Sequence, residues 1–549
     1  EDLKAMQEQH IHIEMHVSDE GIIKKDVPLF GGMHYLKANI AVNDDLKKRG
    51  LIYKDEEVLH SVALCWRCQT RLYHAPLNAW FVNVQSLKPL LKKTNEKMNW
   101  FPKHFKYGRF LKSLENAPDW NISRNRYWGS PVPVWECECS ERFVPGSIAE
   151  LEEASGEKIN DLHKPFIDQV KVKCIKCNKL AKRVPEVLDS WIESGSASFA
   201  ERHFPFNKQD KLEDFFPPDF IAEYTGQIRA WFYVLHVIGG VLYKSEAFKN
   251  VVVEGVILGT DGRKMSKNYG NYPDPKEMLQ KYGGDALRLY LMGSSVMHGE
   301  DILISGDQYR NQVKGTMLIL WNVYNFFVSY ANVDSWSPQS QKSILRQSSG
   351  QAVKSQNVLD QWILSLLNKL VKDVTSDLDT YDTIRPIEKI QNFVKDFSTW
   401  YIRRSRDRVG PSATDQRDKN AFYTSCYEVL VTLSKLLAPI TPFLAEEIYR
   451  NLTDEESVHL ADWPQAHESL ISLNTMFQME RIREIVEHIH AIRKEKELRV
   501  RQPLKRLGIF GVPEKEKNAY GKFEKLLKEE LNIKNMKLQK NLKELNRIN

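Results

Sequence analysis

The pattern of apolar and polar positions changes character near residue 305 of this 549-residue chain. Between about residues 76 and 300, short apolar runs alternate with stretches of helical periodicity, which predicts an α/β domain. Two runs are strand candidates: residues 219–224 precede a helix that we expect from Gly226 to about Leu242, and residues 251–258 precede a glycine-rich loop. Loops that follow parallel strands lie at the carboxyl edge of a sheet, so we expect a ligand site there.

Beyond that point the apolar positions recur only at helical spacing. We expect one helix over residues 358–374, a second from Asp382 to Tyr401, and a third from about Ala421 to Leu437. Such helices with short connections indicate an antiparallel bundle. The Ser- and Gln-rich segment 334–355 predicts a surface excursion, and residues 464–473 predict a linker into the C-terminal segment.

Composition and charge add one further expectation. The hydrophobic content of 42% and the charged content of 27% are typical of a globular protein, and no run of about 18 apolar residues predicts a membrane span. The net charge of +6 is unevenly distributed along the chain. Residues 471–549 hold 19 Lys and Arg against 11 Asp and Glu, while the rest of the chain is close to neutral. A basic end favours a polyanionic partner, although a solvated lysine-rich helix would give the same count.

Six of the seven cysteines come in close pairs, which favours metal binding over disulfides in a chain of this length. The pairs Cys137/Cys139 and Cys174/Cys177, separated by 34 residues, offer four thiolates, the donor set of a closed structural zinc site. Cys65 and Cys68 form a lone pair that would need two more ligands for Zn²⁺. Reduced, unpaired thiols remain the alternative for both.

The glycine-rich loop from Gly259 to Gly270 carries two lysines, Lys264 and Lys267, three positions apart. Glycines permit backbone shapes that other residues resist, so this loop can close over a ligand. Cationic side chains on such a loop can stabilise the charge that develops on a departing pyrophosphate. The pattern therefore predicts a phosphate clamp, with an ordinary basic loop as the alternative.

The segment Lys264-Met-Ser-Lys-Asn268 resembles the KMSKS signature of the class I aminoacyl-tRNA synthetases, with Asn268 in place of the last Ser. Asp285-Ala-Leu-Arg follows at the spacing of that family. The resemblance implies a Rossmann-type catalytic core that uses ATP and Mg²⁺ to form an aminoacyl adenylate. It implies that ATP is bound by Lys264, Met265, Ser266 and Lys267, and that the two lysines are catalytic.

Two further segments resemble one subgroup of this family. Residues 122–135 resemble its ISRQRxWGxPIP motif, and residues 400–408 resemble a segment typical of isoleucyl enzymes. Asn125, within the first motif, resembles the eukaryotic-type branch of these enzymes, which some bacteria also carry. The resemblance implies a cytoplasmic isoleucine–tRNA ligase, a monomer or part of a larger synthetase assembly, whose full-length form edits mischarged valine. Valyl and leucyl enzymes, or a noncatalytic tRNA-binding module, are the alternatives. The family's HIGH signature does not occur in this sequence, so we expect the N-terminal catalytic half to be missing and the chain alone to be inactive.

The same resemblance implies which residues form the amino-acid and adenylate pocket. The family pattern Glu-Gly-x-Asp-Gln reads Glu223-Tyr-Thr-Gly-Gln227 here, so Tyr224 and Gly226 depart from it. Glu223 suits a substrate ammonium, although an acid at a helix N-terminus is also favourable without a ligand. The residues expected to line the pocket are Glu223, Gln227, Trp231 and Trp191. For the two tryptophans, the alternative is that they only pack in the core.

The remaining expectations concern tRNA and editing. We expect four segments: the end of an editing insertion (1–75), the second half of the catalytic core with a zinc knuckle (76–305), a helical anticodon-binding domain (306–465), and a basic α+β junction that binds tRNA (466–549). The residues expected to contact tRNA(Ile) are Arg403, Arg404, Arg406 and Arg408, although cations at a helix end are also favourable without RNA. Asp2 resembles the end of the editing motif.

Overall fold

The computed structural model describes residues 5–6, 8–12, 14–18, 20–65, 68–73, 78–267, 269–338, 357–510 and 520–539. The chain folds into two compact units. The first comprises Glu1–Asn83 with Pro118–Ser190, and the second comprises Val84–Ala117 with Trp191–Asn549. These units cross the sequence-based boundary at residues 75 and 76, because the paired cysteines belong to the first unit and the parallel sheet to the second.

The first unit contains one long helix and several small antiparallel sheets. Helix α2 (Tyr35–Lys48) ends before Gly50, which has a φ of 67°, as its place after the helix predicts. Strands β1 (Phe81–Val82) and β3 (Trp120–Asn121) pair, as do β4 (Ser123–Arg124) and β9 (Val187–Leu188). A four-stranded sheet has the order β6-β5-β8-β7. Its strands and the adjoining helix are β5 (Trp135–Glu136), β6 (Arg142–Phe143), β7 (Lys171–Lys173), β8 (Leu180–Arg183) and α5 (Ile148–Ser155).

The second unit begins with a parallel three-stranded sheet. Strand β11 (Asn250–Glu254) lies between β10 (Phe220–Tyr224) and β2 (Asn99–Phe101). Helices α3 (Val84–Asn95) and α8 (Trp231–Tyr243) pack against each other beside it, with α4 (Lys112–Asn116) next to α3. The core of this part is aromatic, with the rings of Trp100, Phe232 and Phe248 in edge-to-face contacts.

Both strand predictions are confirmed in part, with two differences. The helix after β10 begins later than expected, because a 3₁₀ turn (Thr225–Arg229) precedes α8. The run 251–258 is interrupted, since β11 ends at Glu254 and β12 (Ile257–Leu258) pairs instead with β13 (Ile302–Leu303). Gly255 lies between them, and a Cβ there would be 1.9 Å from the backbone oxygen of Glu300. This close approach requires glycine and redirects the strand.

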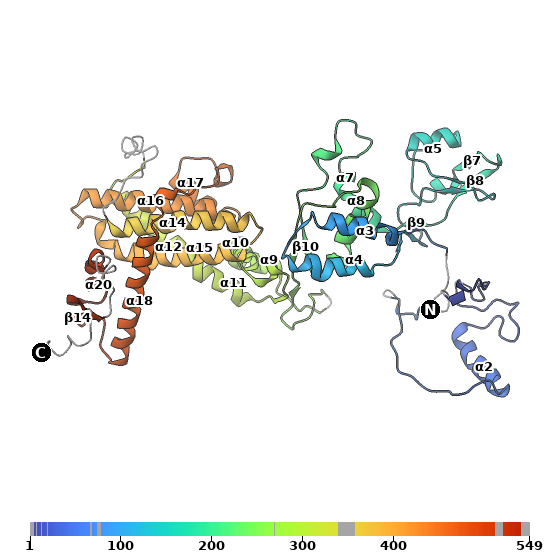
Figure 1. Cartoon of the computed structure of the whole chain (residues 1–549), viewed down its shortest axis with the longest axis horizontal. Helices are drawn as coiled ribbons and strands as arrows, with labels where there is room; N and C mark the ends of the chain where they lie inside the picture. Colours follow the sequence, from blue (N-terminus) through green and yellow to red (C-terminus); the bar gives the residue numbers. More distant parts are fainter. Residues whose placement is uncertain are drawn as a thin grey trace. The chain divides into compact units, whose positions relative to one another are not determined.

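Three short helices lead from the sheet to a helical bundle: α9 (Pro275–Tyr282), α10 (Gly284–Met292) and α11 (Gly306–Gln312). The bundle, seen in yellow and orange in Figure 1, confirms the predicted helices. Its helices are α12 (Leu318–Val333), α14 (Val358–Leu378), α15 (Ile384–Asp396), α16 (Gln416–Leu437) and α17 (Pro442–Leu452). Helix α15 continues into a π turn (Phe397–Ile402), so the apolar stripe extends to Tyr401 as expected. Most of the predicted surface excursion, residues 339–355, lies outside the described residues.

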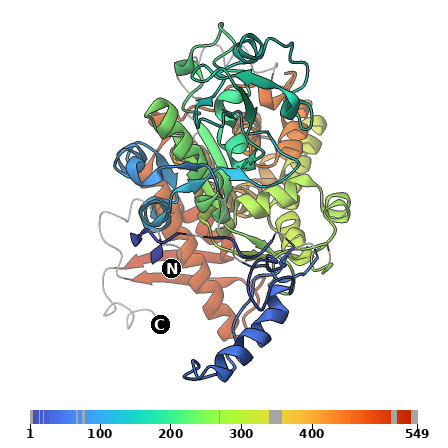
Figure 2. The same cartoon turned by 90° about the vertical axis from the view of Figure 1, so that its right-hand side faces the viewer.

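The C-terminal segment is α+β. Helix α18 (Leu473–Glu495) is followed by β14 (Leu504–Phe510), α20 (Glu524–Glu530) and β15 (Ile533–Gln539). The two strands pair in parallel and lie side by side in Figure 2. Phe523 and Leu527 join this segment to the bundle core. None of the described helices is long and apolar enough to cross a lipid bilayer.

Candidate active site and nucleic-acid interface

Two carboxylates lie at the carboxyl edge of the parallel sheet. Glu254 is the last residue of β11, and Glu223 is the next-to-last residue of β10. Tyr224, the last residue of β10, is in register with Glu254. An oxygen of Glu223 accepts a hydrogen bond from the Tyr224 N–H at 3.0 Å. Burial raises the pKa of Glu254, and the neighbouring carboxylate of Glu223 raises it further. This edge therefore favours a cationic or hydroxyl-bearing ligand.

Tyr224 and Gly226, the two departures from the family pattern, form one packed pair. The ring of Tyr224 lies over the backbone of Gly226, and a Cβ at Gly226 would be 2.4 Å from that ring. No side chain fits at position 226 while the ring is there. The two changes therefore compensate each other structurally.

Trp191 and Trp231 come from two helices in close contact, α6 (Ser190–Gly195) and α8. The Trp231 indole N–H donates to the Ser194 carbonyl at 3.0 Å. A Cβ at Gly195 would meet Ile238 of α8 at 2.6 Å, so glycine is what allows the helices to approach. The side-chain oxygen of Gln227 accepts from the Trp231 N–H at 3.1 Å, which fixes the start of α8. Both tryptophans are partly exposed, as pocket walls require.

The lysine loop, residues 259–271, projects from β12. A bridge between Leu258 and Lys264 and a bond from the Gly259 N–H to the Arg263 carbonyl close its base. Lys264 and Lys267 are exposed, and in the part of the chain that the structure describes neither forms an ion pair. The Lys264 Nζ lies 5.6 Å from the centre of the Tyr224 ring, which places this lysine beside the sheet edge.

Asn271 holds the lysine loop from inside. Its side-chain oxygen accepts from the Ser266 N–H at 3.1 Å, and its amide donates to Asp261 at 2.8 Å. The side chain is buried, with 7% of its surface exposed. The bond from Asn271, together with the Arg263 N–H, lowers the pKa of Asp261 to about 2. The loop thus has a defined shape that leaves both lysines outside.

The four cysteines predicted to bind zinc lie together in two turns of the four-stranded sheet. All four sulfur atoms lie within 4.8 Å of one another, with 3.3 Å between those of Cys137 and Cys177 and 3.6 Å between those of Cys139 and Cys174. Zn–S bonds of about 2.3 Å in a tetrahedron give sulfur separations of about 3.8 Å. The donor set and its spacing therefore fit Zn²⁺.

The described residues around Cys65 and Cys68 share two backbone features with the four-cysteine cluster. The Gln69 N–H donates to the Cys65 carbonyl at 2.8 Å, and Gln69 has a φ of 59°. In the four-cysteine cluster, the Asn178 N–H donates to the Cys174 carbonyl at 3.0 Å, and Asn178 has a φ of 61°. The described residues supply no further ligand group around this pair, so it is half of a metal site at most.

Arg408, expected to contact tRNA, is instead buried against carboxylates. Its guanidinium donates to both oxygens of Asp360 at 2.7 Å and to Asp418 at 2.8 Å. The side chains of Arg408 and Asp360 are 9% and 0% exposed. This is a structural ion pair inside the bundle, so the expectation for Arg408 is corrected: its charge is already satisfied and shielded.

The other three predicted arginines lie nearer the surface. Arg403 pairs with Glu530 at 2.7 Å, and Arg404 pairs with Glu529 and Glu530, so both join the bundle to α20. Arg406 is exposed and has no ion pair within the described ranges. An RNA phosphate would have to compete with the glutamates for two of the three, whereas Arg406 is accessible.

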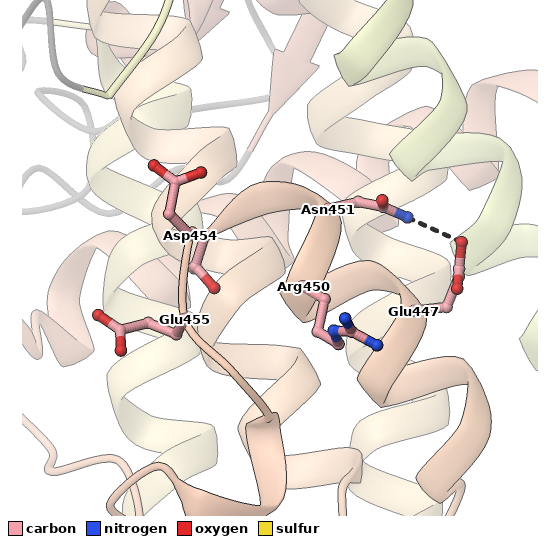
Figure 3. Close-up of a pocket in the computed structure, with 6 residues that line it drawn as sticks. Glu447, Arg450, Asn451, Asp454 and Glu455 are labelled. Atoms are coloured by element: carbon pink, nitrogen blue, oxygen red, sulfur yellow. Dashed lines mark hydrogen bonds between the residues drawn. The ribbon is translucent and has the colours of Figure 1, made fainter.

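A polar pocket of about 430 Å³ lies at the C-terminal end of α17 (Figure 3). It is lined by Glu447, Arg450, Asn451, Thr453, Asp454 and Glu455. The Asn451 amide donates to Glu447 at 2.8 Å. Three carboxylates against one guanidinium make this pocket unsuited to a phosphate or an RNA backbone, so it does not extend the nucleic-acid interface.

The comparisons with known proteins agree with this arrangement. Residues 32–304 match the family described as tRNA synthetases class I (I, L, M and V), and residues 360–507 match the anticodon-binding domain of tRNA ligases. The chain therefore belongs to the class I aminoacyl-tRNA synthetases of the isoleucyl, leucyl, methionyl and valyl group.

Within that group, the similar curated proteins are named isoleucine–tRNA ligase. The one from Treponema denticola is 41% identical over 93% of this chain and 47% of its own length. The one from Chlamydia trachomatis is 40% identical over 97% of this chain and 51% of its own length. The chain thus spans about half the length of these relatives.

A solved structure supports the fold. Mycobacterium tuberculosis methionyl-tRNA synthetase in complex with methionyl-adenylate matches with a TM-score of 0.51 and 18% identity, over 71% of this chain and 66% of that one. The predicted class, a Rossmann-type core followed by a helical anticodon-binding domain, is confirmed.

Some candidate residues fall outside these findings, and others were missed. Asp2 and Asn268 lie outside the described residues. Sequence reasoning missed Glu254 and Asn271. Glu254 ends a parallel strand near Glu223, so the argument that selected Glu223 could have selected it too. Asn271 carries no such signal, because its role depends on how the loop folds back.

Proposed function

We propose that the chain forms the second half of the catalytic core and the tRNA-binding part of an isoleucine–tRNA ligase. In this reaction the carboxylate of isoleucine attacks the α-phosphorus of ATP, and pyrophosphate leaves. A hydroxyl of the terminal ribose of tRNA(Ile) then attacks the carbonyl of isoleucyl-AMP, and AMP leaves. No covalent enzyme intermediate is needed, because positioning and charge stabilisation suffice.

The accessible lysine loop is the observation that carries this proposal. Lys264 and Lys267 are exposed, the Lys264 Nζ lies 5.6 Å from the centre of the Tyr224 ring at the sheet edge, and the Asn271 bonds fix the shape of the loop. Their ammonium groups would bind the β- and γ-phosphates and offset the charge that grows on pyrophosphate. Met265 and Ser266, which lie between the two lysines in the sequence, would also contact ATP. Mg²⁺ would arrive with the nucleotide and neutralise part of the same charge.

The pocket beside the loop would hold the amino acid. Glu223 would accept the substrate ammonium, and Gln227 would fix the junction between β10 and α8. Trp191 and Trp231 would form apolar walls for the branched side chain. Such walls separate isoleucine from valine by one methylene, about 1–3 kcal/mol, which explains why the full-length protein would edit mischarged valine. Asp2 would belong to that editing site.

Zinc would have a structural role in this enzyme. Cys137, Cys139, Cys174 and Cys177 would hold one Zn²⁺ in a closed tetrahedral site. Cys65 and Cys68 would hold a second ion if another pair of ligands from the full-length protein completes the site. The two ions would stabilise the first compact unit without taking part in adenylation.

The bundle and the C-terminal segment would bind tRNA(Ile). Arg406 is the accessible member of the predicted arginine cluster, and Arg403 and Arg404 would contribute by exchanging their glutamate partners for phosphates. The proposed setting is the cytoplasm, with the enzyme acting as a monomer or within a larger synthetase assembly.

ATP–pyrophosphate exchange by the full-length protein tests the assignment. We expect turnover to be best with isoleucine, and Lys264→Ala and Lys267→Ala each to lower kcat by about 10²–10³-fold. Lys276→Ala, which removes an exposed lysine from the first turn of α9, is the matched control and should change little. If turnover is best with valine or leucine, the chain belongs instead to a valyl- or leucyl-tRNA synthetase. Binding of tRNA without exchange would indicate a noncatalytic module.

A further inference from the structure

Tyr224, the last residue of β10 (Figure 1), carries an aromatic ring whose place is fixed by the backbone around it. The residue is in register with Glu254 in the central strand, so the sheet sets where its side chain starts. The ring then lies over the backbone of Gly226, where a Cβ would be 2.4 Å from the ring carbon Cε2 and 2.6 Å from the hydroxyl oxygen. Gly226 therefore makes room for the ring, and the far edge of the ring rests on the turn that follows β10.

The backbone of Lys264 is fixed as well. Lys264 forms a β-bridge with Leu258, the last residue of β12, and its carbonyl accepts from the side-chain amide of Asn271 at 3.4 Å. The side chain differs from the backbone, because it is exposed and forms no ion pair within the described residues. A free lysine side chain samples many rotamers, and this freedom must be lost when its ammonium binds a phosphate.

The Tyr224 ring limits this freedom. The Lys264 Nζ lies 5.6 Å from the ring centre, a distance at which the negative face of an aromatic ring attracts an ammonium. A ring contacts only one side of an ammonium, so the remaining N–H groups can still donate to phosphate oxygens. Both residues belong to the second compact unit. The family pattern has glycine at position 224 and so offers no ring there, which makes this contact a property of the present chain.

The other two cations of the lysine loop are placed differently. Arg263 pairs with Asp261 at 2.8 Å and lies 4.6 Å from the centre of the Tyr269 ring, so its charge is already engaged within the loop. Lys267 is exposed, and within the described ranges it has neither an ion pair nor an aromatic partner. Among these three cations of the described loop, Lys264 is the one that contacts the sheet edge.

We propose that Tyr224 is a positioning residue for adenylation, whose ring holds the Lys264 ammonium over the sheet edge before ATP binds; this rests on the proposed function. The lysine side chain is then already ordered when the nucleotide arrives, so less conformational freedom is lost on the way to the transition state. The reaction itself is unchanged: a carboxylate oxygen of the amino acid bonds to the α-phosphorus, and the bond to the pyrophosphate oxygen breaks. Tyr224 neither gains nor loses a proton.

ATP–pyrophosphate exchange by the full-length protein tests this role, with Tyr224 replaced by Leu or by Phe. Leucine keeps apolar bulk over Gly226 but has no aromatic ring, so we expect Tyr224→Leu to lower kcat about two- to fivefold, the range of an exposed cation–π contact. The KM for ATP should change little, because Lys264 acts on charge that appears in the transition state. Tyr224→Phe keeps the ring and should keep kcat close to that of the unmodified protein.

Double-mutant cycles separate this role from a general loss of packing at the turn. In the Lys264→Ala background, Tyr224→Leu should have no further effect on kcat, because the ammonium that the ring holds is gone. In the Lys267→Ala background, it should still lower kcat about two- to fivefold. Tyr107→Leu is the matched control: the Lys106 Nζ lies 5.3 Å from the centre of the exposed Tyr107 ring on a π-helical turn, so this variant should leave kcat unchanged.

Equal effects of Tyr224→Leu in the two lysine backgrounds would overturn the proposal, as would an unchanged or higher kcat in Tyr224→Leu or an equal loss in Tyr224→Phe. Should Tyr224→Leu not fold, Tyr224→Met also lacks a ring and must show the same pattern, or the proposal is refuted. An unmodified full-length protein that forms no isoleucyl adenylate, or normal exchange in Lys264→Ala, would instead refute the proposed function. The two failures are therefore distinguishable.

Discussion

The side-chain amide of Asn271 lies 2.8 Å from the carboxylate of Asp261, across the neck of the lysine loop. The carboxylate keeps its charge because its pKa is lowered to about 2, chiefly by this bond. A folded-state pKa below the ordinary 3.8 means that the contact is fully present above about pH 4 and is lost as the pH falls through about 2.

We therefore predict that Asn271→Ala raises the pKa of Asp261 toward 3.8 and slows adenylation about tenfold, because the lysines lose their fixed presentation. Carboxyl ¹³C NMR titration measures the first effect and single-turnover kinetics the second. Asn207→Ala is the control, since Asn207 makes a similar bond to Asp210 at 2.9 Å in another loop. If the pKa of Asp261 is unchanged in Asn271→Ala, the hydrogen bond from Asn271 is not what lowers it.

The buried pair of Arg408 and Asp360 should be essential for the bundle. Removal of one partner leaves an uncompensated charge inside, so we expect Arg408→Ala to lower the free energy of unfolding by about 3–5 kcal/mol. Arg406→Ala, two positions earlier and exposed, should change it by less than about 0.5 kcal/mol. Urea denaturation compares the two. If Arg406→Ala nevertheless weakens tRNA binding while Arg408→Ala is mainly destabilising, the division of roles is established.

His236 should make the α/β part sensitive to acid. Its Nε2–H donates to the Leu91 carbonyl at 2.8 Å, and burial lowers the pKa of the imidazole from 6.5 to about 4. The neutral form is therefore favoured in the folded state. Stability from this group is complete above about pH 6.5 and falls as the pH drops toward 4, by an amount on the order of 3 kcal/mol.

We predict that His236→Gln removes this pH dependence between pH 4 and 6.5, which equilibrium unfolding at several pH values measures. Exposed His163 provides the control, because its pairing with Asp161 lies at the surface of the other unit. A His163→Gln variant should keep the acid sensitivity. Identical pH profiles for His236→Gln and the unmodified protein would rule out the buried imidazole as the cause.

The four-cysteine cluster should contain one equivalent of zinc. We expect Cys174→Ser to lose that metal and to destabilise the first compact unit, because a structural site contributes folding free energy directly. Elemental analysis of the purified protein measures the content. Cys426→Ser, which alters a buried thiol of the bundle far from any other cysteine in the sequence, should keep it. Full zinc content in Cys174→Ser would exclude the four-cysteine cluster as the zinc site.

Hydrophobic periodicity was enough to predict the helices of the bundle, since each buries one apolar stripe that is visible in the sequence. It also predicted β10, because Phe220–Tyr224 is bounded by turn residues and a helix. It failed at residues 251–258, where one glycine pressed against Glu300 divides the run. The contact between Gly255 and Glu300 joins residues 45 positions apart in the sequence, so it cannot be predicted from the local pattern of residues.

The candidate site shows the same limit. The spacing of cysteines predicted four thiolates that do lie together, because the two turns belong to one small sheet. The arginines were selected by position on a helix end alone. Arg408 turned inward because Asp360 and Asp418, 48 and 10 residues away, converge on it, and no local signal distinguishes it from Arg406.

The packing of Tyr224 on Gly226 also couples two positions of this site. A Cβ at position 226 would lie 2.4 Å from the Tyr224 ring, so an aspartate there requires the ring to move. Changes at these two neighbouring positions should therefore not contribute independently to the stability of the turn.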